Sequence, residues 1–195
     1  MNEIKNVCVY CASSTQIPAT YFKAAERLGE LLARQGINLI DGAGRQGLMG
    51  CINDAVLAAG GTVTGIIPHF MVEQGWHHPH LTRLIETDTM HERKQMMAGM
   101  SDGIIALPGG CGTMEELLEA ITWKQLGLYL KPIIILNTAN FYAPLFELLQ
   151  QAVNQNFMRR EHKNIWQTAS TPEEAINLLH TTPLWNKEIR KFAAI

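Results

Sequence analysis

Short, uninterrupted apolar runs recur along this chain, and each is followed by a longer segment with helical periodicity. Residues 104–107 and 133–136 are such runs, without a polar residue inside them. Strands buried on both faces have this composition, and they occur in parallel sheets that helices cover from both sides. We therefore predict an α/β fold with a Rossmann-like, doubly wound and mostly parallel sheet of about seven strands, with helices on both faces.

The same patterns predict the individual elements. The apolar runs predict strands at residues 6–12, 37–41, 62–67, 81–87, 103–107, 132–137 and 164–168. Helical periodicity, with glycines after several of the ends, predicts helices at residues 18–35, 48–59, 90–100, 114–126, 142–156 and 172–180. Since no linker or low-complexity tract divides the sequence, we expect one domain over residues 1–195, with its core at about 6–181.

Composition argues against several classes of protein. Hydrophobic residues make up 47% of the chain and charged residues 17%, which is typical of a compact globular protein. The formal net charge of -2 argues against binding to nucleic acid or to a membrane surface. The first residues lack the apolar region of a signal peptide, and no apolar stretch is long enough to span a membrane. We therefore expect a cytoplasmic protein.

The cysteines Cys8, Cys11, Cys51 and Cys111 indicate a reducing compartment rather than disulfides. Cys8 and Cys11 have the C-x2-C spacing of zinc and redox sites, but no second pair of matching spacing follows. Both lie in or beside the first apolar run. Because free cysteine is among the most buried residue types, we favour packing over metal binding for this pair.

Residues 69–80 depart from the regular alternation. This segment carries His77, His78 and His80 together with Trp76, and it shows no helical period. A connection of this length between two strands is typical of a mobile lid or a partner contact. Metal binding by the histidines is a less favoured alternative, because no acidic or cysteine ligand is interleaved with them.

Ligands of doubly wound sheets bind beyond the carboxyl ends of the strands, so the loops at that edge are the candidates. Residues 11–15 include Ser14, whose hydroxyl suits either a phosphate or a turn and helix cap. Gly42, Gly44 and Gly47 form the G-x-G-x-x-G pattern of dinucleotide-binding folds. The acidic residue that such folds need about 20 positions later is missing, which leaves close approach of the backbone to a ligand and exposed amides at a helix start.

Arg93 and Lys94 follow Thr89 and Glu92, which form a capping box and so predict a helix start. Cations in the first turns of a helix are unfavourable by a few tenths to about 1 kcal/mol, because this end is already electropositive. An anionic ligand between these side chains and neighbouring loops would offset that cost. The alternative is that both side chains are solvated.

Residues 108–116, Pro-Gly-Gly-Cys-Gly-Thr-Met-Glu-Glu, form the most informative loop. Gly109, Gly110 and Gly112 permit positive φ and let backbone amides converge at a helix N-terminus, where a phosphate is favoured. Thr113 adds a hydroxyl. Glu116 has two interpretations: it completes a capping box with Thr113, or it takes part in catalysis beside a bound nucleotide.

These motifs resemble the Lonely Guy proteins, the cytokinin riboside 5'-monophosphate phosphoribohydrolases, many of which carry the older label of possible lysine decarboxylases. Residues 108–116 match the P-G-G-x-G-T-x-x-E signature of that family, and residues 90–94 match its second motif. Residues 42–50 resemble its G-G-G-x-x-G-L-M-G stretch, with Ala43 in place of the middle glycine. We expect Ala43 to adopt a tight turn at negative φ, at little cost.

The resemblance implies hydrolysis of the N-glycosidic bond of a nucleoside 5'-monophosphate, either adenosine monophosphate or an N6-substituted cytokinin-type relative, to a free base and ribose 5-phosphate. It implies Arg93 and Glu116 as the catalytic pair, no cofactor and no metal, and a homodimer. Glu73 is the counterpart of a family glutamate, in a segment that departs in length. With the loops described above, the expected nucleotide-binding residues are Glu73, Lys94, Gly109, Gly110, Gly112, Thr113, Glu115, Thr122, Gly42, Gly44 and Ser14.

Other functions compete with this one. A nucleotide-binding or carrier protein of the same fold would use the same loops without turnover, but a pure binder does not need a carboxylate facing the sugar. Lysine decarboxylation needs pyridoxal phosphate on a Schiff-base lysine, and Lys94, the only lysine inside a motif, lies next to Arg93. A nicotinamide-dependent oxidoreductase lacks its ribose-binding acid. We therefore favour the phosphoribohydrolase.

Overall fold

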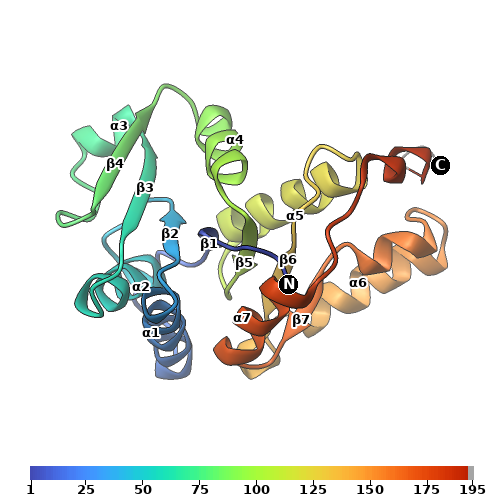
Figure 1. Ribbon diagram of the computed structural model, residues 1–195, viewed down its shortest axis with the longest axis horizontal. Coiled ribbons are helices and arrows are strands. Elements are labelled where there is room, and N and C mark those ends of the chain that lie inside the picture. The colour runs from blue at the N-terminus through green and yellow to red at the C-terminus, as the bar shows by residue number, and fades with distance from the viewer. Residues whose placement is uncertain (193–195) are drawn as a thin grey trace.

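In the computed structural model, which describes residues 1–192, seven strands form one sheet in the order β4-β3-β2-β1-β5-β6-β7 (Figure 1). All neighbouring strands pair in parallel. The strands are β1 (Asn6–Tyr10), β2 (Asn38–Asp41), β3 (Val63–Pro68), β4 (Arg83–Thr87), β5 (Gly103–Ala106), β6 (Ile133–Leu136) and β7 (Gln167–Ala169). The predicted parallel α/β fold is confirmed, and each predicted strand is present.

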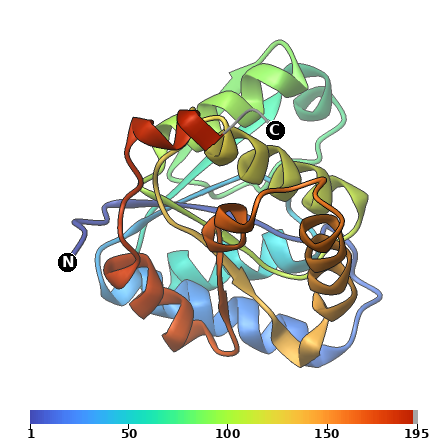
Figure 2. The same cartoon turned by 90° about the vertical axis from the view of Figure 1, so that its right-hand side faces the viewer.

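Helices cover both faces of this sheet. They are α1 (Ala19–Arg34), α2 (Gly47–Ala58), α3 (His69–Glu73), α4 (Met90–Met100), α5 (Cys111–Gln125), α6 (Ala143–Asn154) and α7 (Pro172–Thr181). Helices α1, α2 and α7 pack on one face, and α4, α5 and α6 pack on the other (Figures 1 and 2). Two separate apolar cores result, because the strands bury side chains on both faces. No helix within residues 1–192 is long and apolar enough to cross a membrane.

Sequence signals explain the start of α4 and the packing of α1. The Thr89 hydroxyl accepts a hydrogen bond from the Glu92 amide at 3.1 Å, so the predicted cap of α4 is confirmed. On α1, the buried positions Ala25, Leu28, Gly29 and Leu32 have the spacing of one helix face. Gly29 allows α1 and α2 to approach closely, since an added Cβ would lie 2.8 Å from the Cβ of Ala55.

Two predictions about the helices are wrong. Residues 69–73 form α3, which is too short to show a helical period in the sequence. Helix α5 begins at Cys111 rather than at residue 114, with Gly110 as its N-cap. Thr113 therefore lies inside the first turn, and the capping box between Thr113 and Glu116 does not form.

Lys124 on α5 is fully buried, which is rare for an ammonium group. Its Nζ donates a hydrogen bond to the Lys131 carbonyl at 2.8 Å and lies 5.1 Å from the centre of the Trp185 ring. Desolvation lowers the pKa of Lys124 to about 8. This side chain connects α5 to the segment before β6 and to the C-terminal segment.

We predict that Lys124→Met flattens the pH dependence of stability between about pH 8 and pH 10.5. The folded-state pKa lies below the unfolded value of 10.5, so the unfolded chain binds more protons in this window and the wild-type free energy of unfolding rises with pH. The rise due to Lys124 is on the order of 2–3 kcal/mol. Urea melts at both ends of the window measure it, and the difference between the two proteins removes the titration of cysteines and tyrosines. If the free energy of unfolding changes with pH in the same way in the two proteins, the lowered pKa of Lys124 is contradicted.

Candidate active site

A cavity of about 680 Å³ opens beyond the carboxyl ends of β1, β2 and β5. Strand β1 lies between β2 and β5, and its neighbours lead to helices on opposite faces of the sheet. This reversal of winding direction is the place where doubly wound sheets bind their ligands. The loops after β1, β2 and β5 line the cavity together with residues of α4 and the segment after α3.

The loop after β1 is fixed against the start of α2. Gly47 has a φ of 62°, and an added Cβ there would lie 2.4 Å from the carbonyl carbon of Ser13, so only glycine fits. The amides of Leu48 and Met49 donate to the Ala12 carbonyl at 2.9 and 3.3 Å. Because these amides already have an acceptor, the predicted exposed amides at this helix start are not free for a ligand.

The turn at Ala43 differs from the expectation, because its φ is 63° rather than negative. Its amide donates to the buried Asp41 carboxylate at 2.9 Å, and its carbonyl accepts from the His78 amide at 2.8 Å. A left-handed conformation costs about 1–2 kcal/mol, while the buried methyl group contributes about 0.8 kcal/mol. The net cost of alanine is therefore small. Burial raises the pKa of Asp41 to about 6, although the hydrogen bond from Ala43 opposes the shift.

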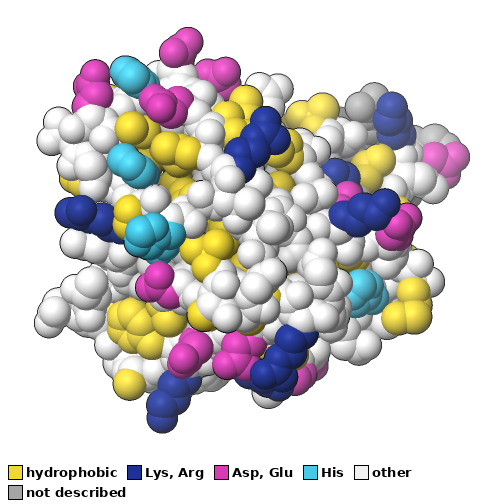
Figure 3. All heavy atoms as spheres, turned by 60° about the vertical axis from the view of Figure 1, so that its left-hand side comes forward, with side chains coloured by type: hydrophobic (Ala, Val, Ile, Leu, Met, Phe, Trp, Pro, Cys, Tyr) yellow, Lys and Arg dark blue, Asp and Glu magenta, His cyan; other side chains and the backbone are white. Residues whose placement is uncertain are grey.

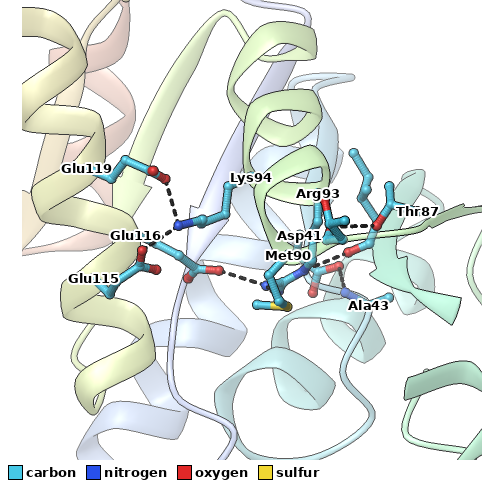
Figure 4. A network of polar contacts seen from close by, with 11 residues as sticks. Asp41, Ala43, Thr87, Met90, Arg93, Lys94, Glu115, Glu116 and Glu119 are labelled. Atoms are coloured by element: carbon cyan, nitrogen blue, oxygen red, sulfur yellow. Dashed lines mark hydrogen bonds and ion pairs between the residues drawn. The ribbon is translucent and has the colours of Figure 1, made fainter. Parts of the chain in front are cut away.

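Arg93 on α4 holds its guanidinium at the floor of the cavity, facing Glu116 on α5 (Figure 4). The Arg93 Nε donates to the Ile66 carbonyl at 3.0 Å, and one terminal nitrogen donates to the Glu116 carboxylate at 3.1 Å. The other terminal nitrogen lies against Gly42, where an added Cβ would approach it to 1.9 Å. Gly42 therefore leaves room for this guanidinium.

Lys94 lies on the side of α4 that faces α5 and binds two carboxylates (Figure 4). Its Nζ contacts Glu115 and lies 3.0 Å from the Glu119 carboxylate. The side chains of Arg93 and Lys94 are only 8% and 5% exposed. The alternative that both are solvated is therefore wrong, since a buried cation needs such partners.

Glu116 is a nearly buried carboxylate at the cavity, with 11% of its side chain exposed. Burial raises its pKa, and the positive charge of Arg93 opposes this shift without cancelling it. Since the capping box is absent, the carboxylate does not serve the helix start. Its position instead leaves it as a charged group held beside the space that a ligand would occupy.

The glycines before and within the first turn of α5 have different reasons to be glycine. None has positive φ, so the conformational reason that the sequence suggested is wrong. A Cβ at Gly109 would lie 2.1 Å from the Thr113 hydroxyl, so the fold requires Gly109. A Cβ at Gly110 or Gly112 would meet nothing within 4 Å. Both line the cavity, and α5 has no side-chain cap, so its first amides remain available to a ligand.

Much of the remaining lining of the cavity is apolar, and it includes side chains to which the sequence assigns no role. Trp76 is half exposed there, and its carbonyl accepts a hydrogen bond from the Arg45 amide at 3.1 Å. His77 pairs with Gly44 in an antiparallel bridge, and the buried His78 lies 3.0 Å from Asp54. Figure 3 shows several histidine side chains next to hydrophobic ones on one face of the molecule. The larger apolar side chains of the lining include Met49, Ile67, Met71, Trp76, Met90 and Met97.

The predicted site residues divide into two groups. Those that line the cavity are Ser14, Gly42, Gly44, Arg93, Gly110, Gly112, Thr113, Glu115 and Glu116. Those that the structure does not bring to the lining are Glu73, Lys94, Gly109 and Thr122. Glu73 ends α3, with its carboxylate 3.4 Å from the His69 Nε2, and the Thr122 hydroxyl donates to the Leu118 carbonyl at 2.8 Å. Arg45 escapes prediction because it occupies a variable motif position. Trp76 lies in the segment 69–80, which the sequence predicts as a lid or a partner contact without a role for this side chain.

Solved structures with this fold include carriers of a metal cofactor. The molybdenum cofactor binding protein of Rippkaea orientalis is 26% identical with a TM-score of 0.67, and the match covers 90% of this chain and 95% of that one. The molybdenum cofactor carrier protein of Chlamydomonas reinhardtii has the same TM-score at 21% identity, again over 90% and 95% of the two chains. The second similarity shows the fold alone.

Closer sequence relatives are named as enzymes. Cytokinin riboside 5'-monophosphate phosphoribohydrolase LOG of Oryza sativa subsp. japonica is 39% identical over 90% of this chain and 72% of its own length. Cytokinin riboside 5'-monophosphate phosphoribohydrolase LOG5 of Arabidopsis thaliana is 40% identical over 91% of this chain and 78% of its own length. The family model described as possible lysine decarboxylase matches residues 49–179. The chain therefore belongs to this family, that of the cytokinin riboside 5'-monophosphate phosphoribohydrolases, the Lonely Guy proteins.

Proposed function

We propose that this protein is a cytoplasmic hydrolase that cleaves the N-glycosidic bond of adenosine monophosphate or an N6-substituted cytokinin-type relative. The products are the free base and ribose 5-phosphate, and residues 1–195 act as one nucleotide-binding domain. The observation that carries the proposal is the buried pair of Arg93 and Glu116, 3.1 Å apart, beside the uncapped start of α5. A site that only binds nucleotides has no need of a carboxylate in this position.

The start of α5 is the proposed phosphate site. Orphan amides and the helix dipole, equivalent to about half a positive charge, favour an anion there. Gly110 and Gly112 leave open space beside these amides. Nothing in the fold requires glycine at either position. We assign Thr113, whose side chain folds over Gly109, to the same subsite with Ser14 from the loop after β1.

Glu116 is the proposed catalytic carboxylate. Glycosidic cleavage passes through a sugar with oxocarbenium character, so a carboxylate near C1' stabilises the developing positive charge and can orient or deprotonate water. Arg93 fixes the Glu116 carboxylate through its hydrogen bond, and its positive charge opposes the rise in pKa that burial causes. The methionines and Trp76 form an apolar wall suited to a base and an apolar substituent on it.

The structure argues against the decarboxylase suggested by the older family label. Pyridoxal phosphate needs a lysine that can form a Schiff base, and none of the residues lining this cavity is a lysine. Lys94 is not a lining residue, and it binds Glu115 and Glu119. The fold shared with molybdenum cofactor carriers makes a carrier the competing proposal, which differs in having no turnover.

We predict that Glu116→Gln lowers kcat for release of adenine from adenosine monophosphate by about 10²–10⁴-fold, because it removes the charge that stabilises the sugar cation. Binding of the nucleotide should persist, since the phosphate site is intact. Chromatography of the products measures turnover, and calorimetry measures binding. Glu147→Gln, an exposed position on α6, is the matched control. Binding without turnover by the wild type itself would favour the carrier.

We predict that Gly112→Ala stabilises the protein while it weakens the nucleotide site. Alanine inside a helix is favoured over glycine by roughly 0.5–1 kcal/mol, and the new Cβ meets no protein atom. The KM for adenosine monophosphate should rise severalfold, because the methyl group enters the phosphate subsite. Gly99→Ala on α4, which also meets nothing within 4 Å, should raise the melting temperature without changing KM. Equal effects of both changes on KM would refute this placement of the phosphate.

We propose a homodimer that buries the exposed apolar residues of α5 and the turn after it. Leu118, Leu126 and Leu128 are 39%, 42% and 66% exposed. Exposed leucines on one helix and the turn after it favour association with a second copy. We predict that Leu126→Glu with Leu128→Glu converts a dimer into a folded monomer in sedimentation experiments, whereas Leu148→Glu on α6 does not. A monomeric wild type would refute the dimer.

A further inference from the structure

Apart from Arg45, the charged side chains that line the cavity carry a net negative charge. They are Arg93, Glu115 and Glu116, one positive and two negative charges. A 5'-phosphate brings a charge of about −1.5 to −2 near neutral pH. The start of α5 supplies the equivalent of about half a positive charge. A further cation is needed for a strong phosphate site.

Arg93 and Lys94 are poorly placed to supply that charge. Arg93 is paired with Glu116 at 3.1 Å, and Lys94, which is not a lining residue, binds both Glu115 and Glu119. Both cations are buried. Turning Arg93 toward a phosphate would leave the nearly buried Glu116 carboxylate without its partner, which is strongly unfavourable. Turning Lys94 would break its contacts with two carboxylates.

Arg45, on the loop after β2, differs from both. It is exposed at the cavity, and within residues 1–192 no carboxylate lies at ion-pair distance from it. Its backbone is fixed on both sides: the amide donates to the Trp76 carbonyl, and its carbonyl oxygen packs on Gly50, where an added Cβ would lie 2.3 Å away. Arg45 therefore combines a positioned backbone with an unpaired guanidinium.

The sheet order brings Arg45 and the start of α5 to one space. Strand β1 separates β2 from β5, and strands are spaced about 4.8 Å apart, so roughly 10 Å separates the two loops. Ser13 and Ser14, from the loop after β1, line the cavity between them. A phosphate above these serines would face amides on one side and the guanidinium on the other.

We propose that Arg45 binds the 5'-phosphate together with the start of α5, and that it thereby sets the preference for nucleoside monophosphates over nucleosides. The inference rests on the proposed function, because it takes the phosphate of that substrate as the ligand. A guanidinium suits this role, since its planar donors match two phosphate oxygens.

The test compares Arg45→Ala and Arg45→Lys with the wild type and with Arg83→Ala, which removes an exposed arginine on β4. Arg45→Ala should raise the KM for adenosine monophosphate roughly tenfold to a hundredfold with kcat nearly unchanged, because binding is lost equally in the ground and transition states. Calorimetry should show the same loss for ribose 5-phosphate and none for adenosine. Arg45→Lys should recover part of the affinity, and Arg83→Ala should match the wild type.

The outcomes separate this inference from the proposed function. Unchanged affinity of Arg45→Ala for ribose 5-phosphate overturns the role of Arg45, even if the wild type hydrolyses adenosine monophosphate. Equal losses for adenosine and ribose 5-phosphate overturn it too, because they place Arg45 elsewhere than at the phosphate. If the wild type shows no turnover but Arg45→Ala still weakens binding of ribose 5-phosphate, the role of Arg45 stands and the hydrolase is refuted.

Discussion

The guanidinium of Arg93 is the group on which the arrangement of the cavity depends. Through it, α4 contacts the end of β3 at the Ile66 carbonyl, α5 at Glu116, and the loop after β2 at Gly42. A buried ion pair of this kind contributes little net stability, because desolvation of both charges offsets their attraction. Its value here is geometric: removal of either charge leaves the other buried and unpaired, so the elements are held in one arrangement. The floor of the cavity is thus fixed before a ligand binds.

Much of the fold follows from the sequence, because the strands are short and buried on both faces. Runs such as residues 104–107 and 133–136 have no polar residue, so both faces of such a strand must be covered. The sheet has seven parallel strands, as the apolar runs predict. The packing interpretation of Cys8 and Cys11 agrees with their burial, since each belongs to a different apolar core. Local capping chemistry predicts the start of α4 correctly. It fails at α5, where the glycine-rich turn enters the helix without a side-chain cap.

The features that sequence could not predict depend on contacts between loops. The positive φ of Ala43 is stabilised by Asp41 and by the segment after α3, which lies far along the chain. The sequence predicts Lys94 as a nucleotide-binding residue because it adjoins Arg93. Successive residues on a helix point about 100° apart, however, and Lys94 binds Glu115 and Glu119. The sequence alone does not show why each glycine of the motif is a glycine. Gly109 is required by a neighbouring side chain, whereas nothing in the fold requires Gly110 or Gly112.

A carboxylate and a bound phosphate repel each other, so the spacing between Glu116 and the start of α5 matters. Both belong to α5, but the amides of its first turn and Glu116 are separated by about one helical turn, a rise of roughly 5–8 Å. The helix start favours negative charge, while the carboxylate one turn later, fixed by Arg93, favours positive charge. A nucleoside monophosphate undergoing cleavage has this same distribution, with an anionic phosphate at one end of the ribose and a developing cation at C1'. One helix can therefore bind both ends of the sugar. Its first amides bind the phosphate, and its second-turn carboxylate stabilises the cation at C1'.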